Sequence, residues 1–272
     1  MSEPELCARN ELPKIYAVSR VVQEAKNIRS IFFKGKLDCK PGQFVMVWLP
    51  GVEEKPMAVS EVTKTEFGFA YHTVGKFTKA LDKVKKGDKV GVRGPYGNSF
   101  SLVEPAVVIG GGVGMSSVST LIDALKKPII INGARDKEHV MYQNRFKGKK
   151  MIITTDDGSL GKKGFTTDAL RGVLKENPKT KKVYTCGPEI MMKKILETCN
   201  AYKVDCEASL ERYMKCGYGI CGNCMVDDKI LCIDGPIFSS KLLNTLKDFG
   251  NAARLKTGRK VSLKEYYSWK SG

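Results

Sequence analysis

The sequence contains little histidine and no long hydrophobic run. It has two histidines among 272 residues, so neither a metal centre built from several imidazoles nor a Ser–His–Asp triad is expected. No apolar run approaches the roughly 20 residues of a membrane-spanning helix, and the acidic N-terminal stretch lacks the apolar core of a secretory signal. We therefore predict a cytoplasmic chain with no membrane partner.

Acidic residues are also in deficit. The chain has 46 Lys and Arg against 29 Asp and Glu, a formal net charge of +17. A field of this sign attracts phosphates, so nucleic-acid binding is one interpretation. The lysines are nevertheless spread along the chain, without a long basic block or interleaved aromatic residues. We predict no nucleic-acid partner and interpret the charge as a soluble surface or one that docks an acidic protein.

The pattern of apolar runs predicts an α+β protein of several domains. Residues 1–102 are expected to form an antiparallel β-barrel, because short β-branched or aromatic runs are separated by Pro and Gly turns. One exception is a helical spacing of apolar residues over 76–85. The predicted strands are 14–22, 28–33, 43–49, 57–62, 68–73 and 89–93.

Residues 103–203 alternate strands with helices. Short, continuously apolar runs at 106–109, 129–131, 151–153 and 183–185 are typical of parallel strands buried on both faces. Helical stretches run to 126 and over 167–175 and 189–201. This order predicts a doubly wound α/β nucleotide-binding domain.

A glycine-rich loop, 110–114, directly follows the first of these strands. Glycines between a strand and a helix start can cradle a phosphate. Met115 stands where the usual dinucleotide fingerprint has its third glycine, so a tight structural turn is the alternative. The segments 186–188 and 156–159 also follow strands, where ligands of open α/β sheets bind. A buried cysteine would also explain the first segment, and a plain polar turn would explain the second. The predicted nucleotide-site residues are Gly110, Gly111, Gly112, Gly114, Asp156, Cys186, Gly187 and Pro188.

Cysteine spacing dominates residues 204–272, which we expect to form a small C-terminal domain with a helix near 239–249. Cys216, Cys221, Cys224 and Cys232 follow the pattern C-x4-C-x2-C-x7-C, whose first part matches the plant-type ligands of a [2Fe–2S] cluster. Glycines at 217, 219 and 222 allow the loop to adopt positive φ. A zinc site is the alternative, but it usually shows a second C-x2-C. Cys7, Cys39, Cys186, Cys199 and Cys206 are expected to be free thiols.

These features together resemble a known family. A β-barrel followed by Gly-Gly-Gly-Val-Gly and Cys-Gly-Pro resembles the ferredoxin–NADP reductase superfamily. The stretches 209–217 and 232–236 more narrowly resemble the electron-transfer subunits of NAD-dependent dihydroorotate dehydrogenase. The resemblance covers nearly the whole chain. It implies FAD in the barrel, NAD in the second domain, a [2Fe–2S] cluster in the third, and an FMN-containing catalytic subunit as partner in a heterotetramer.

The resemblance also implies which residues hold the flavin. The family motif Arg-Pro-x-Ser corresponds to Lys-Pro-Met-Ala here. Lysine lacks the bidentate fork of arginine, and alanine lacks the hydroxyl, which Ser60 or backbone N–H groups would have to replace. A second family segment corresponds to 70–78, with Phe77 where the family often has glycine. The implied flavin residues are Lys55, Pro56, Met57, Ala58, Ala70, Tyr71, His72, Gly75 and Thr78.

The function implied by this resemblance is electron transfer from the partner's FMN through [2Fe–2S] and FAD to NAD+, which needs no general base in this chain. One alternative is the flavin and iron–sulfur subunit of an NADH-dependent ferredoxin:NADP oxidoreductase, a sulfide dehydrogenase or a hydrogenase. Another is a zinc-stabilised binding module. NAD is expected over NADP, because Asp156 and Asp157 would repel a 2′-phosphate, although Arg135 argues for the opposite preference.

The cluster loop is expected at the surface that faces the catalytic subunit. Tyr218 and Ile220 should then be exposed in the free chain, as apolar groups of an interface. Lys215 and Arg212 flank the cysteines, and we expect them to meet acidic residues of the partner.

Overall fold

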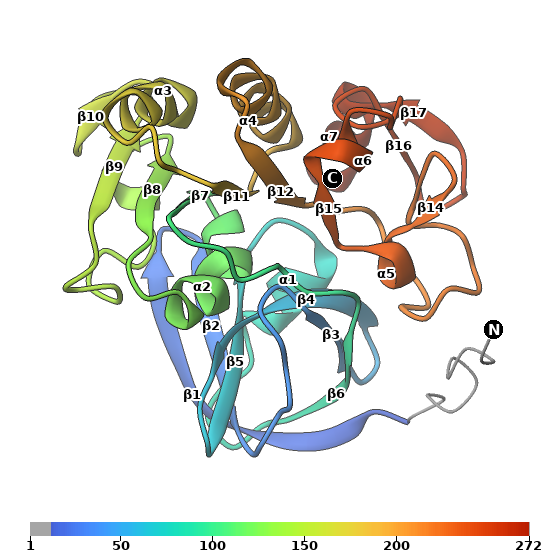
Figure 1. Ribbon diagram of the computed structural model, residues 1–272. Helices are drawn as coiled ribbons and strands as arrows, with labels where there is room; N and C mark the ends of the chain where they lie inside the picture. The colour runs from blue at the N-terminus through green and yellow to red at the C-terminus, as the bar shows by residue number, and fades with distance from the viewer. Residues whose placement is uncertain (1–11, 272) are drawn as a thin grey trace.

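The computed structural model describes residues 12–271, so Cys7 lies outside the described part. The first part of the chain contains β1 (Lys14–Ala25), β2 (Ile28–Lys34), β3 (Phe44–Leu49), β4 (Glu53–Val62), β5 (Glu66–His72), α1 (Lys76–Leu81) and β6 (Lys89–Tyr96). The strands close into an antiparallel barrel in the order β1-β2-β5-β4-β3-β6 (Figure 1). Alternate side chains, such as those of Ile31, Phe33, Val45 and Val47, fill the barrel interior. The predicted barrel is confirmed.

The second part contains β7 (Ala106–Gly111), α2 (Gly114–Ala124), β8 (Ile129–Ala134), the 3₁₀ turn η2 (Lys137–His139), β9 (Met151–Thr155), β10 (Lys162–Lys163), α3 (Thr166–Glu176), β11 (Lys182–Cys186), α4 (Glu189–Tyr202), β12 (Asp205–Ser209) and β15 (Ile237–Ser239). Its strands form one sheet in the order β10-β9-β8-β7-β11-β12-β15, parallel except for β15. Ile109 of β7 packs with Leu170 of α3 and Ile195 of α4, whereas Val108 packs with Leu121 of α2. Burial on both faces explains the continuously apolar run and confirms the doubly wound pattern.

The sheet continues past residue 203, the predicted boundary of the third domain. β12 pairs with β11 in parallel and β15 pairs with β12. The boundary therefore cuts through one sheet. The sequence did not predict β12, because this strand lacks a continuous apolar run and contains polar residues that are buried in the fold. Its Glu207 accepts hydrogen bonds from the N–H and the hydroxyl of Ser101 and forms an ion pair with Lys182 at 3.1 Å.

The rest of the C-terminal region is built from short elements beside the barrel (Figure 1). These are β13 (Met225–Val226), β14 (Lys229–Ile230), α5 (Leu231–Asp234), α6 (Ser240–Leu243), β16 (Ala252–Arg254), β17 (Lys260–Ser262) and α7 (Leu263–Ser271). The helix predicted over 239–249 is wrong, because α6 ends after one turn. Asn244 instead exchanges side-chain hydrogen bonds with Asn200, and the Thr245 hydroxyl donates to the Leu242 carbonyl. Such local polar contacts compete with helix continuation.

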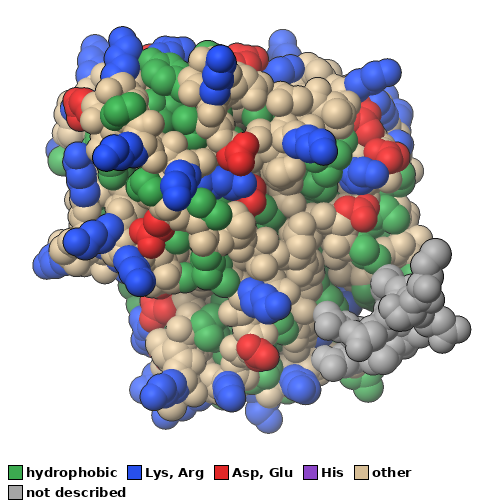
Figure 2. All heavy atoms as spheres, in the orientation of Figure 1, with side chains coloured by type: hydrophobic (Ala, Val, Ile, Leu, Met, Phe, Trp, Pro, Cys, Tyr) green, Lys and Arg blue, Asp and Glu red, His purple; other side chains and the backbone are tan. Residues whose placement is uncertain are grey.

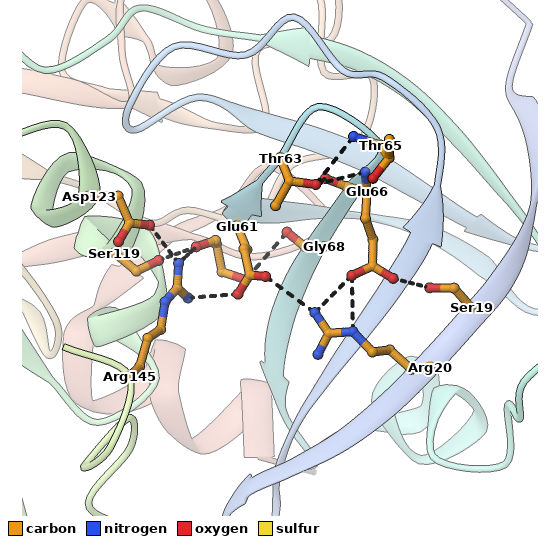
Figure 3. A network of polar contacts seen from close by, with 11 residues as sticks. Ser19, Arg20, Glu61, Thr63, Thr65, Glu66, Gly68, Ser119, Asp123 and Arg145 are labelled. Carbon is orange, nitrogen blue, oxygen red and sulfur yellow. Dashed lines mark hydrogen bonds and ion pairs between the residues drawn. The ribbon is translucent and has the colours of Figure 1, made fainter. Parts of the chain in front are cut away.

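Arg145 joins the second domain to the barrel (Figure 3). Its Nη2 donates to the Ser60 carbonyl of β4 at 2.8 Å and to Oδ2 of Asp123 in α2 at 2.7 Å. Glu61 of β4 is shared between Arg145 and Arg20. Because a guanidinium offers several donors in one plane, a single side chain contacts both domains.

Positive charge is distributed over the face of the molecule that Figure 2 shows. On the face shown in Figure 2 the lysines and arginines are spread among acidic and apolar side chains and do not gather in one patch. Over residues 12–271, none of the helices has both the length and the apolar character that a membrane span requires.

Candidate electron-transfer site

The four cysteines of the predicted cluster lie in the loop between β12 and β13 and in α5. The four thiols interact electrostatically: Cys216 with Cys221, Cys224 with Cys232, and Cys216 with both Cys224 and Cys232. Among residues 12–271, no three or more His, Cys, Asp or Glu side chains converge on a point that would hold one ion. Four thiolates can ligate two bridged irons, and the C-x4-C-x2-C spacing favours this over a zinc site, which usually shows a second C-x2-C.

The cluster loop adopts the backbone that its glycines were predicted to allow. Gly217, Gly219 and Gly222 have φ of 83°, 88° and 65°. The amide of Gly219 donates to Sγ of Cys232 at 3.1 Å, so the loop already directs an N–H group at a ligand sulfur. A Cβ on Gly217 would lie 2.8 Å from Cγ of Met46. The loop therefore rests directly on strand β3 of the barrel, with no space for a side chain at this position.

Two of these thiols ionise readily. Burial opposes ionisation of Cys216, but N–H groups of the loop, including that of Cys221, outweigh it and lower its pKa to about 7. The contact between Cys224 and Cys232 lowers the pKa of Cys224 to about 7 and raises that of Cys232. The thiolate is the form that binds iron, so the loop favours the ligand state of one sulfur in each pair.

The barrel face beneath the cluster loop carries part of the predicted flavin motif. Strand register places Pro56 opposite Met46 and Ala58 opposite Phe44, and side chains of a strand alternate between its two faces. Met46 and Phe44 pack with residues 210–238, which we call the cluster region. Met57 packs toward the barrel interior. We call the side of the barrel that faces the cluster region the outer barrel face. It consists of Phe44, Met46, Pro56, Ala58, Arg93 and Tyr96.

Lys55, which replaces the family's arginine, turns toward the cluster region. Its ammonium lies 3.2 Å from a carboxylate oxygen of Glu53 and 4.7 Å from the ring centroid of Tyr213. Lys256, from the C-terminal region, pairs with the same Glu53 at 3.3 Å. The predicted flavin motif thus begins where the barrel meets the third domain.

The side chains of the second predicted flavin segment, 70–78, point to two different parts of the molecule. The ring of Tyr71 is buried in the barrel interior and its hydroxyl is 3.0 Å from Asp82, so only its backbone remains available to a ligand. Ala70 packs on the opposite side with residues of the second domain. The hydroxyl of Thr78 accepts from the amides of Val74 and Gly75 at 2.9 and 3.1 Å. The helix start at α1 is therefore already capped by its own threonine.

The two glycine motifs of the nucleotide domain lie against each other. A Cβ on Gly114 would lie 2.5 Å from the carbonyl oxygen of Cys186, and one on Gly187 would lie 3.0 Å from Cα of Gly111. They meet because β7 and β11 are neighbouring parallel strands. Met115, in place of the third fingerprint glycine, packs its thioether over Gly110. The two motifs therefore meet at one edge of the sheet, and their contact with a ligand's phosphates stays a prediction.

Asp156 follows β9 at the same edge of the sheet. It is exposed, and its amide donates to the carbonyl of Ala134 at 3.1 Å. The neighbouring Asp157 accepts from the amide and hydroxyl of Ser159, which lowers its pKa. Arg135 directs Nε to the ring of His139 at 3.2 Å. Arg135, the residue that would favour a 2′-phosphate, thus already forms a hydrogen bond within its own loop.

Sequence analysis missed two residues that tie the barrel to the cluster region. Arg93 donates to the carbonyl of Cys216 at 2.6 Å. The side-chain amide of Asn98 donates to the carbonyl of Ile237 at 2.8 Å and accepts from its N–H at 2.9 Å. Arg93 lies in β6, and Asn98 follows this strand by two residues. Their role could not be predicted because their partners lie far away in the sequence.

Known proteins share this organisation. Residues 211–244, which include all four cluster cysteines, match the family model described as the iron-sulfur cluster binding domain of dihydroorotate dehydrogenase B. A Methanocaldococcus jannaschii protein named "Probable dihydroorotate dehydrogenase B (NAD(+)), electron transfer subunit" is 43% identical over 259 residues, which are 92% of this chain and 99% of that protein. A Pyrococcus furiosus protein of the same name is 43% identical over 249 residues, 89% of this chain and 96% of its own length. This chain belongs to the dihydroorotate dehydrogenase B electron transfer subunits.

Solved structures agree with the family's fold. The structure of an NADH-dependent reduced ferredoxin-NADP oxidoreductase superposes with a TM-score of 0.75 at 28% identity, covering 84% of this chain and 89% of that one. Phthalate dioxygenase reductase, at 17% identity and a TM-score of 0.57 over 69% of this chain and 64% of its own, shares the fold. The predicted resemblance to the ferredoxin–NADP reductase superfamily is confirmed.

The surface of the cluster loop differs in part from prediction. Ile220 is 78% exposed, as predicted. Tyr218 is only half exposed, and its ring lies 5.3 Å from the guanidinium of Arg93. The expectation that Arg212 meets the partner is wrong. Its side chain is buried and pairs with the equally buried Glu189, because an unpaired buried charge would be unfavourable.

Proposed function

We propose that this cytoplasmic chain carries electrons between NAD(H) and the FMN-containing catalytic subunit of a dihydroorotate dehydrogenase in pyrimidine synthesis. The observation that supports it most is the position of strand β4. Near one end of β4, the Ser60 carbonyl accepts from the hydroxyl of Ser119 in the nucleotide domain. At the other end Lys55 contacts Tyr213 of the cluster region. The candidate flavin motif, 55–58, lies within this strand.

Each part of the chain then has one task. When bound, FAD exchanges two electrons with nicotinamide as a hydride and single electrons with a [2Fe–2S] cluster. The motif 55–58 and the segment 70–78 would bind the flavin. The glycine motifs with Asp156 would bind NAD, and the four cysteines would bind the irons. No residue needs to act as a general base, which agrees with the scarcity of histidine.

A dihydroorotate-oxidising partner is favoured over a ferredoxin partner by the degree of similarity. The ferredoxin-linked relative is 28% identical, whereas the M. jannaschii electron transfer subunit is 43% identical and is matched over 99% of its length. We propose a heterotetramer with the catalytic subunit, in which electrons leave or enter through the cluster loop.

Cofactor analysis and reconstitution test this function. The purified chain should contain about two irons and two labile sulfides with one FAD. Cys221→Ser should abolish the cluster signal and retain the flavin spectrum, and Cys39→Ser, outside the cluster loop, should retain both. Mixed with the catalytic subunit, the wild-type chain should support dihydroorotate-dependent NAD+ reduction. Stoichiometric zinc without iron after anaerobic purification would contradict the proposal.

A further inference from the structure

Arg93 links the outer barrel face to the cluster loop. Its Nε donates to Oε1 of Glu54 at 2.7 Å, and its Nη2 donates to the carbonyl oxygen of Cys216 at 2.6 Å. The side chain is 9% exposed. One guanidinium therefore joins a barrel carboxylate to the backbone of a cysteine from the predicted cluster.

The other cations near the cysteines are engaged differently. Arg212 pairs with Glu189 and donates to the Glu211 carbonyl, and Lys55 pairs with Glu53. Lys215 is exposed, where solvent and salt screen its charge. Arg93 differs from these residues because it donates directly to the backbone of a cluster cysteine. Its ring contacts, with Tyr96 at 5.5 Å and Tyr218 at 5.3 Å, hold the guanidinium between barrel and loop.

A buried charge at this place has two physical consequences. First, the planar fork of arginine binds two acceptors in fixed directions, which lysine cannot do. Second, reduction of a [2Fe–2S] cluster adds one electron and therefore one negative charge. Charge, hydrogen bonds and exposure set the reduction potential of such clusters, and a poorly screened cation stabilises the reduced form. Glu54 opposes this effect with its own negative charge.

We propose that Arg93 is a positioning residue that holds the Cys216 end of the cluster loop on the outer barrel face. Its positive charge also raises the reduction potential of the cluster, and the negative charge of Glu54 lowers it. This inference rests on the proposed function, because it requires that the cysteines carry the cluster. It predicts opposite effects of removing the two charges, which a merely structural role would not produce.

The experiment is a potentiometric titration of the purified full chain, followed by the EPR signal of the reduced cluster. Arg93→Gln should lower the equilibrium constant for cluster reduction about tenfold, a shift of about 59 mV for one electron. Glu54→Gln should raise the potential, and Arg93→Lys should retain most of it while losing iron faster on dilution. Arg20→Gln is the matched control. Arg20 also forks onto a barrel carboxylate, Glu66, but is 42% exposed and has no contact with the cluster loop among its hydrogen bonds (Figure 3).

The outcomes separate this inference from the proposed function. A wild-type chain without iron would overturn both. A wild-type chain that holds FAD and cluster, with Arg93→Gln and Glu54→Gln at the wild-type potential or shifted in the same direction, would overturn only the role of Arg93. If Arg93→Gln does not retain its cluster, the reduction potential of Glu54→Gln tests the inference instead. This variant keeps the guanidinium, and its glutamine can still accept a hydrogen bond from it. A raised potential supports the inference and an unchanged or lowered one refutes it.

Discussion

Glu189 and Arg212 form a buried ion pair that joins the first turn of α4 to the segment in front of the cluster loop. Nη2 of Arg212 lies 2.8 Å from Oε1 of Glu189, and the same carboxylate oxygen accepts from the amide of Gly250. The pair is almost completely shielded from solvent. It therefore connects the nucleotide domain with two segments of the C-terminal region, one at Arg212 and one at Gly250.

Removing one partner of this pair should strongly destabilise the protein. Glu189→Ala would leave a buried guanidinium uncompensated, and we expect a loss of about 3–5 kcal/mol in the free energy of unfolding. Denaturant titration of the purified chain measures this loss. The control is Glu138→Ala, which breaks the exposed Lys26–Glu138 pair and should lose much less stability, because solvent and salt screen an exposed pair. Equal losses in the two variants would contradict the structural role of the buried pair.

The nicotinamide preference should follow the exposed carboxylate at the sheet edge. We expect the ratio of kcat/KM for flavin reduction to favour NADH over NADPH by roughly tenfold, or about 1.4 kcal/mol, because Asp156 would repel a 2′-phosphate. Asp156→Asn should reduce this preference, whereas Asp168→Asn, an exposed acid on α3, should not change it. A wild-type preference for NADPH would reverse the assignment and give Arg135 the deciding role.

Stability should depend on pH through His72. Burial, together with the nearby charges of His139 and Arg135, lowers the pKa of His72 below 6.5. The unfolded chain then takes up a proton at a higher pH than the folded chain. As the pH falls below about 6.5 the unfolded state gains stability, until the pH also passes the folded-state pKa.

This dependence can be measured from unfolding free energies between about pH 5 and pH 8. The wild type should lose stability toward the acidic end, and His72→Gln should show a shallower decline. The difference between the two proteins should be constant near pH 8, where the histidine is neutral in both states. Parallel curves over the whole range would rule out a contribution of His72.

Assembly with the catalytic subunit should depend on the tip of the cluster loop. Ile220→Asp places a charge on an exposed apolar side chain, and we expect the affinity to fall at least about tenfold if the residue lies within the interface core. Tyr218→Asp should also weaken assembly, but its ring contacts Arg93, so this change disturbs the loop as well. Phe165→Asp, at an exposed apolar residue before α3, is the control. Calorimetry at equal iron content measures the effect, and an unchanged affinity for Ile220→Asp would move the interface elsewhere.

The sequence by itself determined the elements and the ligand chemistry of this protein. Strand periodicity, buried apolar runs and glycine loops are local properties, so the barrel strands and the parallel strands of the nucleotide domain were predictable from short windows. The same holds for the cysteines, because the C-x4-C-x2 spacing limits how one loop can present its thiols. Where local signals were polar, as in β12, or were overridden by side-chain contacts, as after α6, prediction was incomplete or wrong.

Tertiary structure alone decided which of these elements meet and which charges are buried. Cys216 and the arginine that binds its carbonyl are 123 positions apart, and nothing in either local segment specifies the other. Arg212 has the sequence context of an exposed cation, yet the fold encloses it with Glu189. Such contacts depend on how whole domains pack. A buried charge is stable only where a distant partner compensates it, and that partner is identified only once the chain is folded.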